Sequence, residues 1–117
     1  MVLFNMTTVK GALSETGTTN DTKITLYGSM ADNTILGDLI NVRDLPYPPV
    51  VTIDVLTENE LNTIKDFATQ ITVGYFYKFE SGDTATIEEA KLNWTNWFNN
   101  KFRRPRFVVR GGELGPN

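Results

Sequence analysis

Two segments with the periodicity of amphipathic helices are separated only by a short turn at Ser81-Gly82, and this pattern constrains the fold most strongly. The first segment opens with Thr57 and Glu60, a capping box in which each side chain satisfies a free backbone N–H group at the helix start. Gly82 provides the left-handed residue with which helices commonly end. The pattern predicts a long helix over 58–80. Its apolar stripe consists of Leu61, Ile64, Ala68, Ile71, Tyr75 and Phe79, widened by Phe67 and Phe76.

A second amphipathic segment follows this turn almost at once. Its start can be capped by Asp83, by Thr84, or by Thr86 with Glu89 completing another capping box. The pattern predicts a helix over 84–103, which a proline then terminates. Its apolar stripe consists of Ile87, Ala90, Trp94, Trp97, Phe98 and Phe102. Because the intervening loop is short, we expect the two helices to fold back as an antiparallel hairpin.

The N-terminal third of the chain predicts two further helices. The longer one covers about 21–40 and is capped by Asn20 or Asp21. Its apolar stripe consists of Ile24, Tyr27, Ala31, Ile35 and Leu39. A short helix is expected over 8–14, and residues 17–20 are expected to form a turn.

The segment between the helices contains three prolines and cannot lie inside a helix. We expect residues 45–56 to form an extended connector, in which the β-branched stretch 50–56 fits either a short strand or an ordered crossing loop. The predicted fold is therefore mainly α: a small bundle of about four helices built on the 58–80/84–103 hairpin. Residues 1–104 would form the helical domain, and residues 105–117 an extended basic C-terminal arm that ends in a flexible tail.

Charge is distributed unevenly along the 117 residues, whose net charge is −3. Residues 1–100 contain six basic and thirteen acidic groups, a net charge of −7, whereas residues 101–117 contain five basic groups and one acidic group, a net charge of +4. The chain contains neither Cys nor His. It therefore lacks disulfides, thiolate metal sites and His- or Cys-dependent catalytic triads. No apolar run approaches the roughly 20 residues that a transmembrane helix needs.

Carboxylates are the remaining candidates for catalysis, and their positions favour structural roles. The pairs Glu58/Glu60 and Glu88/Glu89 open the two helices of the hairpin, where the helix dipole favours acids, and close neighbours on a helix do not face one another. Asp21, Asp32 and Asp38 lack the spacing of a calcium-binding loop. No phosphate-binding motif is present. We therefore expect no enzymatic activity, no cofactor and no metal.

Aromatic residues are concentrated at the end of the first hairpin helix. Four of the five residues at 75–79 are aromatic, more than one buried face can hold, so Tyr75 and Tyr77 are expected to be partly exposed and available for an interface. Gly74 would allow another backbone to approach closely. Trp94, Trp97 and Phe98 coincide with the stripe of the second helix and are expected in the core, although tryptophans could also stack on nucleobases.

The basic C-terminal segment permits three explanations. Its predicted interface residues are Arg103, Arg104, Arg106, Phe107, Val108, Val109 and Arg110. The arginines could bind a nucleic-acid backbone, pair with the acidic surface of another copy, or simply be solvated. The interleaved apolar residues disfavour a solvated tail, and the acidic body disfavours nucleic acid as the main partner. Self-assembly in a head-to-tail ring fits best. The alternative is a small nucleic-acid-binding module that uses this segment and the tryptophans; an unrelated helical adaptor of cellular origin is a third, weaker reading.

The order of these elements resembles the head–tail connector (adaptor, or head-completion) proteins of tailed bacteriophages and related viruses. The resemblance spans residues 8–110: a short helix, a longer helix that opens with Ile24-Thr25-Leu26-Tyr27, a proline-containing connector, two amphipathic helices and an extended arm. The most similar stretch runs from Ala68 to Tyr77 and continues through Glu80-Ser81-Gly82-Asp83 into the last helix.

The resemblance implies a structural virion protein rather than an enzyme. Such proteins form a ring, typically twelve-fold, that docks on the portal protein and extends the DNA channel towards the tail. The partners implied here are further copies of the chain, the portal, and a tail or head-completion protein, with no membrane. DNA would pass through the channel without specific binding, which an acidic wall favours. The implied location is the virion neck, and the host cytoplasm during assembly. The arginines of the arm would have a docking role.

Overall fold

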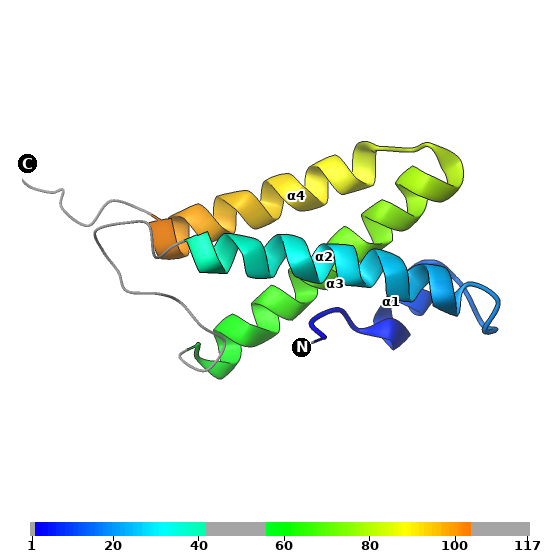
Figure 1. Ribbon diagram of the computed structural model, residues 1–117, viewed down its shortest axis with the longest axis horizontal. Helices are drawn as coiled ribbons and strands as arrows, with labels where there is room; N and C mark the ends of the chain where they lie inside the picture. Colours follow the sequence, from blue (N-terminus) through cyan, green and yellow to red (C-terminus); the bar gives the residue numbers. More distant parts are fainter. Residues whose placement is uncertain (1, 42–55, 104–117) are drawn as a thin grey trace, which may run out of the picture.

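The computed structural model describes residues 2–41 and 56–103, and within these ranges the chain is helical and contains no strand (Figure 1). The helices are α1 (Met6–Ala12), α2 (Asp21–Asn41), α3 (Glu58–Ser81), α4 (Ala85–Phe98) and the π-helix η3 (Asn99–Arg103). The predicted mainly α bundle is confirmed. The predicted connector over 45–56 lies outside the described residues, except for Leu56, and so does the segment after Arg103.

The hairpin of α3 and α4 begins and turns where local sequence signals place it. The Thr57 hydroxyl accepts the Glu60 N–H at 3.1 Å and the Glu60 carboxylate accepts the Thr57 N–H at 2.9 Å, so the capping box is complete. Gly82 ends α3 with φ of +76°. Thr84 is the N-cap residue of α4 but its side chain makes no capping hydrogen bond, and the preceding Asp83 carboxylate accepts the N–H of Ala85 at 3.0 Å.

Two details of the predicted helix starts are corrected. The alternative capping box of Thr86 and Glu89 does not form, because α4 has already begun at Ala85. The first helix begins at Met6 rather than near residue 8, because the Asn5 side chain accepts the N–H of Thr8 and caps it.

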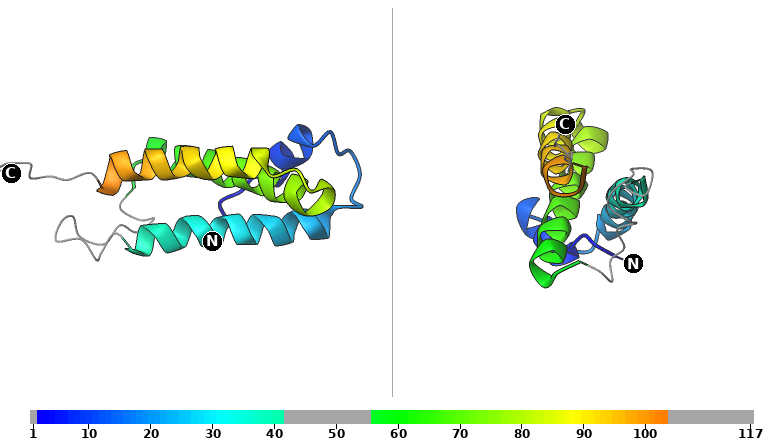
Figure 2. Two further views of the ribbon diagram at one scale, coloured as in Figure 1. Left: turned by 90° about the horizontal axis from the view of Figure 1, so that it is seen from above. Right: turned by 90° about the vertical axis from the view of Figure 1, so that its left-hand side faces the viewer.

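Helix α3 is the central element of the bundle. Figure 1 shows α2 and α4 running in one direction and α3 running back, crossing behind α2, and the end view in Figure 2 places α1 and α2 on opposite sides of α3. The predicted stripe of α2 is buried in full: Ile24, Tyr27, Ala31, Ile35 and Leu39. The core continues through the stripes of the hairpin: Ile64, Ala68, Ile71, Tyr75, Ile87, Ala90, Trp94, Phe98 and Phe102.

Gly74 brings α3 and α4 close together, as predicted. A Cβ atom at this position would lie 2.6 Å from the Cα and 2.8 Å from the backbone nitrogen of Ile87. Real Cβ atoms do not approach backbone this closely, so the contact requires glycine. The missing side chain therefore sets the separation of the two helices.

The last turns of the helical hairpin are wider than an α-helix. The helix predicted over 84–103 is α-helical to Phe98 and then continues as the π-helix η3 to Arg103. Trp94, Phe98 and Phe102 are spaced by four residues, which overshoots the 3.6-residue turn. The wider i→i+5 turn returns Phe102 to the core, 5.6 Å from Phe98 between ring centroids.

Candidate functional site

The predicted assembly arm starts where the described helical body ends. The backbone of Arg103 closes η3. The remaining predicted interface residues lie outside the described residues: Arg104, Arg106, Phe107, Val108, Val109 and Arg110. The arm therefore remains a prediction.

The aromatic cluster at the end of α3 is arranged differently from the prediction. Tyr77 is partly exposed, as expected, but Tyr75 is only 6% exposed, so its assignment to an exposed interface is wrong. Phe79, predicted in the buried stripe, is instead 49% exposed. Its ring stacks on Tyr75 at 5.9 Å and on Tyr27 at 5.4 Å, so it covers the two tyrosines as the outer layer of the cluster. The neighbouring helices therefore leave the last turn of α3 partly exposed to solvent.

Tyr75 is held between α2 and α4 by polar as well as apolar contacts. The Lys91 ammonium of α4 lies 5.0 Å from the centroid of its ring. Burial raises the pKa of the Tyr75 hydroxyl, but hydrogen bonding with Lys91 and Thr34 and the positive charge of Lys91 outweigh burial, and the pKa is lowered overall. The residue therefore joins three helices and is a structural centre, not a docking group.

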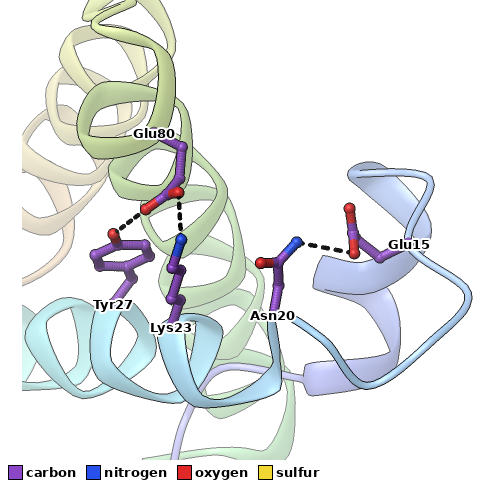
Figure 3. A network of polar contacts seen from close by, with 5 residues as sticks. All are labelled: Glu15, Asn20, Lys23, Tyr27 and Glu80. Atoms are coloured by element: carbon purple, nitrogen blue, oxygen red, sulfur yellow. Dashed lines mark hydrogen bonds and ion pairs between the residues drawn. The ribbon is translucent and has the colours of Figure 1, made fainter.

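Glu80 connects the end of α3 to α2. Figure 3 shows its two carboxylate oxygens facing two side chains of α2: the Lys23 ammonium donates to one at 2.8 Å and the Tyr27 hydroxyl donates to the other at 2.5 Å. The bonds from Lys23 and Tyr27 lower the pKa of Glu80. The bond to Glu80, together with burial, raises the pKa of Tyr27. Figure 3 also shows Asn20 donating to Glu15 at 3.0 Å, which ties the α1–α2 loop to the start of α2.

The three aspartates considered as calcium ligands each fasten a separate part of the fold. Asp21 pairs with Lys10 of α1 at 2.8 Å. Asp38 accepts the indole N–H of Trp94 at 2.7 Å. Asp32 is buried and accepts the backbone N–H groups of residues 3 and 4 at 3.0 and 3.2 Å. In the part of the chain that the structure describes, no group of three or more acidic residues is placed to hold a metal ion.

Sequence reasoning missed the segment that Asp32 holds. Leu3 and Phe4 are buried, and the Phe4 ring lies against the backbone of Gly28, where a side chain would collide with it. The N–H of Asn5 donates to the Thr69 hydroxyl at 3.0 Å. Burial raises the pKa of Asp32, and the two backbone N–H groups offset part of that rise. The sequence signal was Asp32 next to the apolar stripe of α2. Without the partner segment, such an aspartate could equally face solvent.

The glutamates at the helix starts divide into one structural residue and three exposed ones. Glu60 completes its capping box and lies 3.3 Å from Lys101 of η3; the Thr57 N–H and Lys101 lower its pKa. Glu58, Glu88 and Glu89 are exposed on α3 and α4. None of the three has an ion-pair partner within the described ranges.

The tryptophans belong to an aromatic cluster inside the bundle. Trp94 is 1% exposed and contacts Phe67, Trp97 and Phe98, with ring centroids 5.3–5.9 Å apart. Trp97 is half-buried and packs edge-on against Phe102 at 5.7 Å. The prediction that these rings belong to the core is confirmed for Trp94 and Phe98, whereas Trp97 packs against the core and stays partly exposed. Trp94 offers no face on which a nucleobase could stack.

The described surface includes two concave regions that involve α1 and α3 or their neighbours. One has a volume of about 490 Å³ and lies between residues 2–5 and the first half of α3, where Asn62, Lys65, Asp66 and Thr69 make it polar. The other has a volume of about 370 Å³ and is a groove between α1, α3 and α4, largely lined by apolar atoms. The groove is the better candidate for a site that receives an apolar segment.

No protein-family model, curated protein or solved structure matched this chain. No helix in the described ranges is long and apolar enough to span a membrane.

Proposed function

We propose that this chain is a structural virion protein, a head–tail connector whose copies assemble into a ring through the basic segment 103–110. The observation that supports this proposal most directly is a separation of charge. The unpaired acids Glu58, Glu88 and Glu89 lie on the surface of the described helical body, and the arginine cluster begins where that body ends. A surface and an extension of opposite charge on one molecule favour contacts between successive copies.

The use of the titratable groups in the described body also favours a structural role. Glu60, Glu80 and the three aspartates of α2 all hold one part of the fold to another. The family resemblance supplies the rest of the proposal: docking on a portal protein, a tail or head-completion protein beyond it, and a channel through which DNA passes. An acidic body suits such a channel, because its wall repels phosphates and lets DNA slide.

The alternative of a nucleic-acid-binding module is disfavoured by the position of the tryptophans. That function would use Trp94 and Trp97 to stack on bases, but Trp94 is buried in the aromatic cluster and Trp97 is half-buried against Phe67. The arginines alone would support only contacts with the phosphate backbone of a nucleic acid, whose binding affinity depends strongly on salt.

The test compares the full chain with a variant of its arm. Arg103, Arg104 and Arg106 are replaced together with Ser, and mass in solution is followed by sedimentation, with negative-stain imaging of the protein alone and with a portal ring. We expect the parent chain to form rings and the variant to remain a monomer with unchanged helical circular dichroism.

A control variant removes positive charge from the body instead. Lys65 and Lys78, neither of which forms an ion pair among the described residues, are replaced with Ser, and this protein should assemble as the parent does, because its arm is intact. A monomeric parent chain that forms no rings and binds duplex DNA in a salt-sensitive manner would contradict the proposal. A loss of helicity in the arm variant would show that these arginines belong to the fold.

A further inference from the structure

The groove between α1, α3 and α4 exposes mainly apolar surface. Each of the three helices contributes one apolar residue to this lining, here called the floor: Ala12, Val73 and Ala90. The remaining lining residues are polar: the threonines at 8, 69 and 86, and three exposed residues here called the rim, Gln70, Glu89 and Asn93. The close approach of Gly74 to Ile87 brings α3 and α4 together beside it. Such a shape suits a short apolar segment with polar or charged flanks.

We propose that this groove binds residues 106–110 of a second copy of the chain. The inference rests on the proposed assembly through the arm and names the surface that receives it. The segment Arg106-Phe107-Val108-Val109-Arg110 places three apolar residues between two arginines. The apolar residues match the floor, and an arginine matches Glu89, an exposed rim carboxylate with no ion-pair partner among the described residues.

The length of the chain favours a second copy over the same molecule. Ala90 in the groove precedes Arg103 by thirteen residues, which is at most roughly 20 Å along the helix axis at the α-helical 1.5 Å per residue, because the wider η3 rises less. Val108 follows Arg103 by five residues and reaches about 17 Å when fully extended. A contact within one molecule would therefore need a fully extended arm that runs straight back along α4. A second copy is free of this constraint.

The positions of the arm and of the groove on the molecule also determine the kind of assembly. In Figure 1 the described chain ends at the tip of η3, whereas the groove residues Glu89 and Ala90 lie in the half of α4 nearer the α3–α4 turn. A contact that joins different surfaces on successive copies is heterologous, and it closes into a ring when the rotation between copies permits. The groove thus provides the second half of a head-to-tail contact.

The other concave region fits this segment less well. Its walls carry both Lys65 and Asp66, so their charges offset one another towards an arginine. Although Val2, Leu3 and Phe4 also line it, most of its exposed surface is polar, which suits Phe107 and Val108 less well than the groove does. We therefore assign the arm to the groove of α1, α3 and α4.

A synthetic peptide of residues 104–112 provides a direct probe. It is titrated into the full-length chain in which Arg104, Arg106 and Arg110 are replaced with Ser, so that the chain's own arm does not compete. Amide chemical shifts are followed by NMR, and the side-chain amides of Gln70 and Asn93 report on the rim. We expect saturable shifts at these two groups and along the facing sides of α3 and α4.

Two substitutions at the groove test the charge and the shape separately. Glu89→Lys in the same full-length chain should weaken peptide binding about five-fold or more, the effect of losing one exposed ion pair and adding repulsion. Glu88→Lys is the matched control, because it makes the same change on the adjacent residue, which does not line the groove. Ala12→Phe, at an exposed position, should fill the groove and abolish saturable binding. A peptide carrying Val108→Asp should also fail to bind, although its arginines are intact.

A complementation experiment with full-length chains tests exchange between copies. A chain in which Arg104, Arg106 and Arg110 are replaced with Ser retains its groove, and a chain with Ala12→Phe retains its arm. Each should be monomeric alone, and their mixture should give a dimer of one copy of each.

The outcomes distinguish this inference from the proposed function. Peptide binding without rings on a portal would retain the groove and overturn the connector proposal. Rings without saturable peptide binding at millimolar concentration would retain the connector proposal and overturn the groove. The groove assignment would also be overturned if the shifts clustered around Lys65 and Asp66, or if Glu89→Lys and Glu88→Lys behaved alike. If the groove signals of this chain shift as its own concentration rises, without added peptide, then another surface, such as exposed Phe79, occupies the groove.

Discussion

Replacement of Gly74 with Ala should destabilise the bundle, although the same change at most helical glycines is stabilising. A Cβ atom at this position would lie 2.6 Å from the Cα of Ile87, and ordinary van der Waals contact begins at 3.4 Å. The two helices would therefore have to separate by about 0.8 Å at their closest point. Because the opposing atoms belong to backbone, no side-chain rotation relieves the clash. Overpacking of this kind costs about 1–3 kcal/mol.

Gly37 in α2 is the matched control. Nothing lies within 4 Å of a Cβ atom built there, so Gly37→Ala should retain the full helix-propensity gain of about 1 kcal/mol. Gly74→Ala has the same intrinsic gain, so the difference between the two variants isolates the packing penalty. We expect Gly37→Ala to be more stable than Gly74→Ala by about 1–3 kcal/mol.

The assay is equilibrium unfolding in urea, followed by far-ultraviolet circular dichroism. The unfolding midpoints of the two variants should move in opposite directions from the parent, with similar slopes. Thermal midpoints should differ by about 4 °C for each kcal/mol. Equal shifts for the two variants would refute the packing argument, and so would a Gly74→Ala protein that is more stable than the parent.

Two further changes test the polar links between helices. Glu80→Gln should reduce the acid dependence of stability. Because the pKa of Glu80 is lowered in the fold, its contribution to stability is present above its unfolded pKa and is lost as pH falls through the folded pKa. Urea midpoints measured across the acid range check this, and an unchanged pH profile would contradict it. The same variant should lower the pKa of Tyr27, measured by the ultraviolet absorbance of tyrosinate, because Glu80 is the main cause of its rise. Trp94→Phe should lower the free energy of unfolding by about 1–3 kcal/mol, because it leaves Asp38 without the indole N–H. Trp97→Phe breaks no such bond and should cost less. Equal losses of stability in urea would argue against the hydrogen bond.

Much of the helical hairpin could be predicted from the sequence because its signals act over a few residues. The Thr57–Glu60 capping box, the left-handed Gly82 and the 3.6-residue stripe of α2 each depend on neighbours within one or two turns. The close approach at Gly74 was also predictable, because glycine inside a long helix favours contact with another backbone. These elements therefore formed where the residue pattern placed them.

The candidate site depended on contacts between residues far apart in the chain. The periodicity of α3 includes Tyr75 and Phe79 in one stripe, but only the packing of α2 and α4 decides that the first is covered and the second exposed. Likewise, an aspartate on α2 has the same local pattern whether it faces solvent or holds a segment twenty-nine residues away, as Asp32 holds Leu3. The groove has no sequence motif, since it exists only where three helices meet around small side chains.

The sequence alone determined three features: the approximate positions of the helices, the absence of Cys and His, and the basic segment after an acidic body. Caps, stripes and charges are local properties, so they can be read from neighbouring residues. Tertiary structure decided which aromatic residues are exposed, which acids hold the fold together and where an apolar groove opens. These properties depend on which helices pack together and how closely, and that is determined by contacts such as Gly74 against Ile87.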